Sequence, residues 1–397
     1  MATHRSIRSQ RALEPQSRGA RGRLAVLRGA ALLTLGALGA RHAPAYEYYT
    51  TYDGHPIRWA GGVMRLLAYS GDFPAGSDMR RALEDSVGAW NSSPAAFQFE
   101  LGYRPSAEPP NWLPNNFMNE VYFTNSATLL NGAPARFWPI YFGGEFVEVD
   151  VIFDSAVSWS TTTTKVGHPD YGAGGRPFRN TALHELGHAL GLGHEADEYG
   201  IMGQDWNHLH ANGNATQAYP GEDACDGAVA IYGASANVRH DVGVVHWRWS
   251  GAAVRPGTAY SEHARTRVLR ADGSTCAQFT DYSSNPYGEP GYEVSRGHTV
   301  KVEFTFENNG STTQQPRVRY YLSRNDEIEV SDRDLGVDRQ PTLTRDDVYT
   351  MTQEIVIPSD LVVGQTYYLG AVVDPHNQIA EINESNNATY VAIRVRS

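Results

Sequence analysis

The sequence predicts an α+β domain followed by an all-β, immunoglobulin-like sandwich. Up to Gly233, segments with helical periodicity are interleaved with segments that alternate like strands, which is typical of a mixed sheet covered by helices. Beyond Gly233 the helical patterns end, and short strand patterns separated by turn residues continue to the C-terminus. A chain of 397 residues, 41% of them hydrophobic, is long enough to bury two cores.

The pattern of residues 1–45 is that of a cleaved export signal. An arginine-rich segment, residues 1–28, precedes an apolar run over 29–40 and the small-x-small site Ala43-Pro-Ala45. The apolar run has about 12 residues, fewer than the roughly 20 needed to span a bilayer as a helix. We therefore expect bacterial export, cleavage after Ala45 and a secreted protein. A membrane-anchored N-terminus is the alternative, and no further membrane span is expected in the mature chain.

Loss of residues 1–45 makes the protein strongly acidic. The segment contains eight arginines and one glutamate, so the net charge changes from −11 to −11 − (8 − 1) = −18. Such a charge argues against a nucleic-acid partner. It is compatible with an exported protein that binds Ca²⁺.

The first domain is predicted to cover residues 46–234. Strand patterns occupy residues 62–68, 119–124 and 146–153. A helix is expected from Ser77 to Trp90, because Met79, Leu83 and Val87 recur at helical spacing and Ser77 can cap it. A second helix should begin near Asn180, and a third should run over residues 221–232.

The second domain is predicted to be a β-sandwich over residues 296–397. Its strand patterns lie at residues 300–306, 317–322, 350–357, 366–373 and 388–395. Residues 235–295 form either a linker or the first strands of this domain, since residues 250–297 are rich in Gly, Ser and Pro and have few periodic patterns.

The chemistry lies in residues 184–194, His-Glu-Leu-Gly-His-Ala-Leu-Gly-Leu-Gly-His. His184 and His188, four residues apart on a helix, can bind one Zn²⁺ ion from the same face. Glu185 cannot reach the ion beside them, but it can act as general base toward a zinc-activated water. A turn at Gly191 would return His194 as third ligand, leaving one position open as in catalytic sites. The alternatives are a histidine pair on a solvated helix and a zinc site without activity.

This segment resembles the metzincin metallopeptidases, most closely the matrixin branch that includes the matrix metalloproteases. Met202, eight residues after His194, matches the methionine turn that metzincins place beneath the zinc. Asp223 to Gly233, ending in Tyr232-Gly233, is similar to the last matrixin helix. The resemblance implies a metzincin-type catalytic domain, with a twisted mixed sheet and three helices, that hydrolyses peptide bonds in protein or peptide substrates.

The sequence departs from the family pattern at several positions. Matrixins have serine after the third histidine, whereas this chain has Glu195, and residues 203–206 replace the Pro-x-Tyr wall of the specificity pocket. No cysteine switch of the Pro-Arg-Cys-Gly type is present. His168 and Asp170 fit a remnant of a metal-binding loop or, more simply, a solvated loop. Substrate preference therefore cannot be carried over from the family.

Residues 296–396 resemble a bacterial adhesion-type sandwich of the CARDB kind. The matching pieces include Phe304-Thr-Phe-Glu-Asn-Asn-Gly310 and Glu381-Ile-Asn-Glu-Ser-Asn-Asn387. The resemblance implies contact with a cell surface or an extracellular polymer, and the alternative is a stabilising appendage or processed tail. Residues 381–387 could bind Ca²⁺, although acidic and amide side chains more often satisfy turn backbone groups.

Three questions stay open at this point. Cys225 and Cys276, the two cysteines, could form a disulfide in an oxidising compartment or remain two buried thiols. The protein could be a secreted endopeptidase, or a surface adhesion protein whose metal domain is mainly a scaffold. A peptidase acting on cell-wall crosslinks is a third, weaker hypothesis.

Overall fold

A computed structural model describes residues 46–397, with gaps at 107–115, 173, 195–199, 204–208, 246, 256–257, 284–285, 287 and 346. The predicted export signal at 1–45 lies outside the described residues. All the described residues belong to one compact unit. No helix among the described residues is both long enough and apolar enough to cross a membrane.

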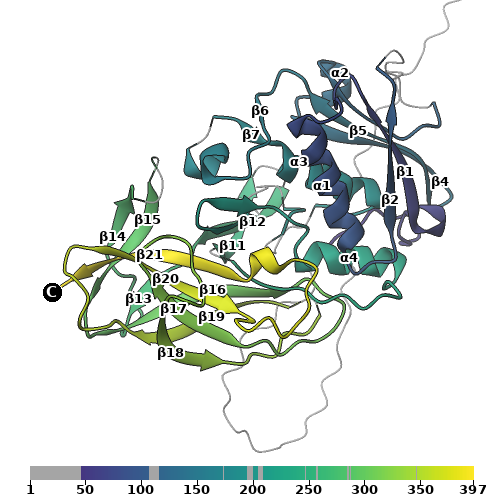
Figure 1. Cartoon of the computed structure of the whole chain (residues 1–397). Coiled ribbons are helices and arrows are strands. Elements are labelled where there is room, and N and C mark those ends of the chain that lie inside the picture. Colours follow the sequence, from purple (N-terminus) through teal and green to yellow (C-terminus); the bar gives the residue numbers. More distant parts are fainter. Residues whose placement is uncertain are drawn as a thin grey trace, which may run out of the picture. The chain divides into compact units, whose positions relative to one another are not determined.

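The N-terminal region is a mixed α/β structure built on a five-stranded sheet (Figure 1). Its strands are β1 (Val63–Tyr69), β2 (Gln98–Arg104), β3 (Glu120–Thr124), β4 (Ala135–Phe142) and β5 (Glu145–Asp154). The order is β2-β1-β3-β5-β4, and only β4 is antiparallel to its neighbour. The three expected strands are present as β1, β3 and β5, whereas β2 and β4 were not expected. Before β1, Pro56 and Arg58 form isolated bridges with Thr50 and Glu145.

Two of the helices cover one face of this sheet. Helix α1 (Asp78–Ser92) begins as predicted, because the Ser77 side chain accepts a hydrogen bond from the Arg80 backbone N–H at 3.1 Å. Helix α3 (Phe178–Leu190) begins two residues before the predicted Asn180, directly after Pro177. Both helices share one core with the buried faces of β1 and β5.

The remaining N-terminal elements are short, apart from α4 (Glu222–Tyr232), which joins the same core. The four-residue helix α2 (Ala127–Leu130) packs on the opposite face of the sheet against Tyr122 and Ile152. The short strands and 3₁₀ helices are β6 (Trp159–Ser160), β7 (Arg176–Pro177), β8 (His210–Asn212), β9 (Ala215–Gln217), η1 (Ala60–Gly62), η2 (Lys165–Gly167) and η3 (Pro169–Tyr171).

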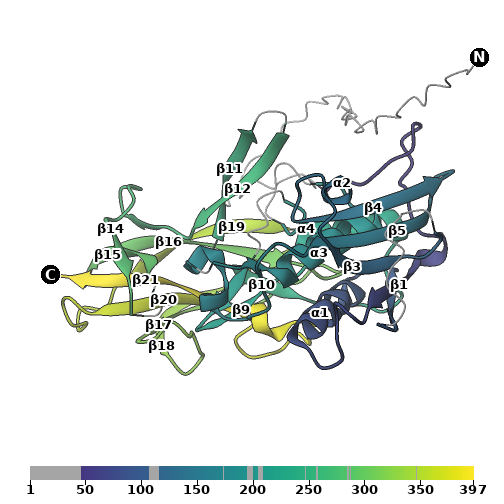
Figure 2. The same cartoon turned by 90° about the horizontal axis from the view of Figure 1, so that it is seen from above.

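The C-terminal region is all-β. Its larger sheet contains β14 (Gln278–Asp281), β15 (Glu289–Ser295), β21 (Ala388–Arg396), β20 (Thr366–Val373), β17 (Val318–Ser323) and β18 (Arg333–Arg339), in that order (Figure 2). The smaller sheet contains β10 (Val242–Val245), β13 (Val268–Arg270), β16 (Thr299–Asn308) and β19 (Val348–Val356). Residues from both sheets form one hydrophobic core, which is the predicted sandwich arrangement. β11 (Trp247–Arg255) and β12 (Thr258–Arg265) form a separate hairpin, and η4 (Glu384–Asn386) precedes β21.

A buried ion cluster links the two regions. Lys165 on η2 is fully buried, and its Nζ lies 2.5 Å from Asp326 Oδ2 and 3.4 Å from Glu289 Oε2. The same ammonium donates to the Tyr390 hydroxyl, which in turn donates to Glu289 Oε1 at 2.7 Å. Removing a long amine from water is costly unless its charge is paired, so these contacts fix Lys165 in one place.

One expectation requires correction, and one open question is answered. His168 was expected in a solvated loop, but it is buried beside Tyr171, with ring centroids 6.4 Å apart. The disulfide considered for Cys225 and Cys276 is absent, because both thiols are free and buried. Cys276 packs in the core of the sandwich, whereas Cys225 lies on α4, near the carboxylates of Asp241 and Glu307.

Candidate metal centre

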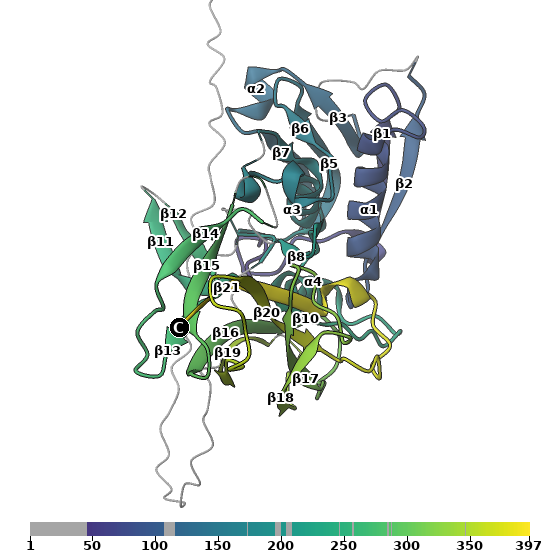
Figure 3. The same ribbon diagram turned by 60° about the vertical axis from the view of Figure 1, so that its left-hand side comes forward.

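Helix α3 positions three of the four predicted site residues, His184, Glu185 and His188, and it lies beside α1 against the sheet (Figure 3). The helix ends at Leu190, because Gly191 has a φ of 120°, a conformation that favours glycine. A Cβ at Gly191 would also lie only 2.9 Å from the carbonyl oxygen of Ile57. The turn returns His194 to the two helical histidines, as predicted.

The three imidazoles converge on one point. His194 Nε2 lies 3.1 Å from Nε2 of His184 and 3.1 Å from Nε2 of His188. Two nitrogens bound at 2.0–2.1 Å to one tetrahedral Zn²⁺ are about 3.3 Å apart, so the observed spacing fits this ion. In the described part of the chain, these are the side chains that form a metal-ligating group of three or more His, Cys, Asp or Glu residues.

Backbone carbonyls orient the two helical ligands. His184 Nδ1 donates to the carbonyl oxygen of Ile201, and His188 Nδ1 donates to that of Leu192, each at 2.8 Å. Each Nδ1 therefore carries the proton, and each Nε2 keeps its lone pair for a metal. Burial lowers the pKa of His184 to about 3 and also lowers the pKa values of His188 and His194. The imidazoles are therefore neutral at neutral pH, as metal binding requires.

Glu185 is buried beside the histidines, with 7% of its surface exposed. Burial raises the pKa of its carboxyl to about 8, although the Phe137 backbone N–H and the nearby Arg176 and Arg136 lower it. A divalent cation at the three histidines would lower this pKa further. Glu185 is thus a buried carboxyl group whose proton affinity lies near the range that general bases need.

Met202 lies directly beneath the ligand helix. A Cβ added to Gly187 would be 2.3 Å from Met202 Sδ, and Met202 is only 2% exposed. The thioether therefore occupies the space that a side chain at position 187 would fill. Gly187 lies between His184 and His188 in the sequence. Met202 therefore contacts α3 directly, and its role in supporting the metal site stays a prediction.

Three ring donors hold the backbone of the same helix. Trp90 Nε1 donates to the Leu183 carbonyl at 2.9 Å, and Trp59 Nε1 donates to the Ala189 carbonyl at 2.8 Å. The Tyr232 hydroxyl donates to the Leu190 carbonyl at 2.6 Å. These bonds fix both ends of the segment that carries His184 and His188.

Two aromatic neighbours of the site were not predicted from the sequence. The Phe137 ring stacks on His188, with centroids 5.0 Å apart and planes at 26°. The Tyr49 hydroxyl lies 3.4 Å from His188 Nδ1, and burial raises the pKa of Tyr49. Phe137 belongs to β4, whose pattern is interrupted by Pro139; proline is tolerated because β4 is an edge strand.

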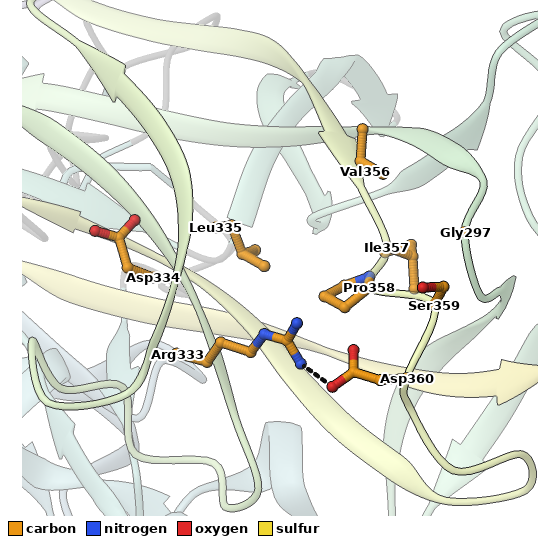
Figure 4. Close-up of a pocket in the computed structure, with 9 residues that line it drawn as sticks. All are labelled: Gly297, Arg333, Asp334, Leu335, Val356, Ile357, Pro358, Ser359 and Asp360. Carbon is orange, nitrogen blue, oxygen red and sulfur yellow. Dashed lines mark hydrogen bonds and ion pairs between the residues drawn. The ribbon is translucent and has the colours of Figure 1, made fainter.

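Two other features supply no described contact to the metal centre: the residues that depart from the family pattern and a cavity on the sandwich. Glu195 and residues 204–206, where the sequence departs from the family pattern, lie outside the described residues. A shallow cavity in the sandwich is lined by residues of β18 and the segment after β19 (Figure 4). Arg333 and Asp360 form an exposed ion pair of 2.9 Å across it. We assign no chemistry to this cavity.

Comparison with known proteins confirms the two resemblances. The family model described as Matrixin matches residues 125–233, which include His184, Glu185, His188, His194 and Met202. The model described as CARDB matches residues 288–391. The chain therefore carries a matrixin domain and a CARDB domain, which indicate a zinc metallopeptidase and an adhesion-like module. No curated protein matched the chain.

Three solved structures show limited similarity. A crystal structure of the CARDB domain of a Pyrococcus furiosus protein, in complex with di-metal ions, is 19% identical over 26% of this chain and 79% of that chain, with a TM-score of 0.21. A solution NMR structure of that domain is 20% identical over 26% and 84%, with a TM-score of 0.21. A β-glucosidase from Erythrobacter marinus is 13% identical over 40% and 16%, again with a TM-score of 0.21. At these scores the likenesses carry no argument about function.

Proposed function

We propose that this chain is a secreted zinc-dependent endopeptidase with a metzincin-type catalytic domain. The observation that carries the proposal is the convergence of three neutral imidazoles beside the buried Glu185, with His194 Nε2 at 3.1 Å from Nε2 of each of the other two. Three protein ligands are typical of catalytic zinc, whereas structural zinc has four. The Met202 contact beneath α3 and the Matrixin match support the same assignment.

The side chains of the site have separate roles. Zinc bound by His184, His188 and His194 would supply a Lewis acid that polarises the peptide carbonyl and lowers the pKa of water. Glu185 accepts a proton from the attacking water and returns it to the leaving amine. The Phe137 N–H holds the Glu185 carboxylate in place during both transfers.

An open strand edge beside the site supports peptide substrates. Among the described strands, β4 pairs with β5 alone, so its other edge is not used within the sheet. Phe137 on this strand contacts both Glu185 and His188. An extended peptide can add to such an edge through main-chain hydrogen bonds, which would place a peptide bond near the site.

Export is part of the proposal, and Tyr46 supports it. The backbone nitrogen of Tyr46 donates to Asp223 Oδ1 at 3.0 Å, and Asp223 is only 4% exposed. Cleavage after Ala45 would turn this nitrogen into a charged amine. The hydrogen bond to the buried carboxylate would then become charge-assisted and stronger. We further propose that the CARDB domain contacts a cell surface or an extracellular polymer.

The test is hydrolysis of a peptide library by zinc-loaded protein starting at Tyr46, compared with its Glu185→Ala variant. We expect at least about 100-fold slower hydrolysis in Glu185→Ala, with unchanged zinc content. Glu145→Gln, at an exposed carboxylate beginning β5, is the control and should retain full activity. Equal hydrolysis by wild type and Glu185→Ala would refute the assigned mechanism. Absence of any cleavage by zinc-loaded wild type, with surface binding that survives His184→Ala, would favour the adhesion hypothesis.

A further inference from the structure

A second group of buried oxygen ligands lies far from α3 in the sequence, at Asp241, Glu307 and Asn386. Asp241 precedes β10, Glu307 lies on β16 and Asn386 lies in η4; their exposed fractions are 3%, 0% and 0%. Asn386 Nδ2 donates to Asp241 Oδ1 at 2.9 Å. A Cβ at Gly243 would lie 3.1 Å from Glu307 Oε1 and 2.9 Å from Asn386 Nδ2. Three separate segments therefore bring these side chains together.

The two carboxylates lack a compensating cation. In the part of the chain that the structure describes, neither Asp241 nor Glu307 has an ion pair with lysine, arginine or histidine; Glu307 Oε1 accepts from the Tyr219 hydroxyl, which carries no charge. Burial raises the pKa of Asp241 to about 7 and that of Glu307 to about 8, and the Asp241 charge contributes to the latter. Two neighbouring buried anions are unfavourable unless a proton or a cation neutralises them.

Buried oxygen atoms without hydrogen-bond partners indicate that a cation, rather than a proton, neutralises the two carboxylates. Glu307 Oε2 and Asn386 Oδ1 have no hydrogen-bond partner, although both residues are fully buried. The Asn309 amide makes no hydrogen bond of regular geometry, although it lies close enough to Asp241 and Glu307 to lower the pKa of both carboxyls. Within residues 381–387, the side chains of Glu381, Asn383 and Glu384 accept hydrogen bonds from backbone N–H groups instead. Unsatisfied buried acceptors are rare in folded proteins and often mark a missing ion or water.

We propose that a Ca²⁺ ion binds between Asp241, Glu307 and Asn386. The ligand set is two carboxylates and one amide oxygen, which suits a hard cation with oxygen coordination. Ca²⁺ tolerates an irregular protein cage, whereas Mg²⁺ requires near-octahedral geometry and keeps most of its waters. Cys225 lies close by, but burial and the surrounding carboxylates raise its thiol pKa, so no thiolate is available to favour zinc.

Such an ion would join the two regions. Tyr219, in the segment that leads into α4, donates to Glu307 on β16 of the sandwich. Ca²⁺ bound to Glu307 would therefore stabilise the structure around α4 as well as the sandwich. This inference does not depend on peptidase activity, because its readout is metal binding and thermal stability.

The experiment is titration of the zinc-loaded full chain with Ca²⁺ at neutral pH, by calorimetry and by thermal unfolding. We expect one Ca²⁺ bound per chain, with an affinity of roughly 10⁻⁴–10⁻³ M as in extracellular modules, and a melting temperature that rises with Ca²⁺ concentration. Glu307→Gln should lose this binding without loss of zinc. Glu354→Gln, at a 67% exposed carboxylate on β19, is the matched control and should bind Ca²⁺ normally.

A second variant keeps the test decisive if Glu307→Gln does not fold. Asn386→Ala retains both carboxylates, and it should weaken Ca²⁺ binding at least tenfold while leaving zinc content unchanged. Unchanged Ca²⁺ affinity in either folded variant would overturn the proposal. A wild-type melting temperature that does not change with millimolar Ca²⁺ would overturn the proposal as well, and would show that protons neutralise Asp241 and Glu307.

Discussion

Gly191→Ala is the sharpest test of how the third ligand is positioned. At Gly191 the backbone has φ 120° and ψ 0°, which costs a residue with a Cβ roughly 1–3 kcal/mol. The new Cβ would also lie 2.9 Å from the Ile57 carbonyl oxygen, a backbone atom that cannot rotate away. Together these effects amount to about 2–4 kcal/mol. The chain can relieve the strain by moving residues 192–194, which displaces His194 from the other two imidazoles.

The expected result is weaker zinc binding. If the strain is released when zinc leaves, about 2–4 kcal/mol corresponds to a roughly 30- to 700-fold loss of affinity, since about 1.4 kcal/mol is tenfold. Competition with a chromophoric chelator measures this affinity. Gly193→Ala is the matched control, because Gly193 does not have a positive φ and the nearest atom to its added Cβ would be Glu47 Cβ at 3.2 Å, with the Glu47 backbone at 3.4 Å or more. Equal zinc affinities for the two variants, with equal melting temperatures, would refute the reasoning.

Three further predictions concern stability. Lys165→Met leaves Glu289 and Asp326 without their buried cation and should lower the free energy of unfolding by about 3–5 kcal/mol in urea denaturation; a loss below about 1 kcal/mol would contradict this. A chain that begins at Tyr46 should melt at a higher temperature than one carrying two additional N-terminal residues, and Asp223→Asn should abolish the difference. Burial raises the pKa of Asp150 to about 7, so the folded state keeps a proton that the unfolded state releases above about pH 4. Stability should therefore fall between about pH 4 and pH 7, and Asp150→Asn should reduce this slope relative to wild type in denaturant titrations.

The local patterns of the sequence predicted the elements that bury a regular face. Ser77 and the spacing of Leu83 and Val87 located α1, and alternation located β5 and β16. Strands without one apolar and one polar face were not predicted. β4 contains Pro139, and β18 is an exposed edge strand rich in arginine and aspartate. Neither strand has the alternating apolar residues on which such predictions depend.

The metal ligands were predictable from local sequence. Helix geometry places His184 and His188 on the same face, and Gly191 indicates the turn that leads to His194. The contacts of Phe137, Tyr49 and the Asp241–Glu307 pair depend on segments that meet only after folding. Asp241 and Glu307 are 66 residues apart in sequence (307 − 241), and nothing local to either residue indicates the other. Whether Cys225 and Cys276 form a disulfide could not be predicted for the same reason.

The indole contacts on α3 provide a built-in optical signal. Trp90 and Trp59 are buried, and their N–H groups bind the carbonyls of Leu183 and Ala189, the residues directly before His184 and directly after His188. Indole emission responds to hydrogen bonding and to the polarity of its surroundings. Loading and loss of the metal should therefore be visible in the intrinsic fluorescence of the unlabelled protein, and substitution of Trp90 or Trp59 by Phe would show which end of the helix moves.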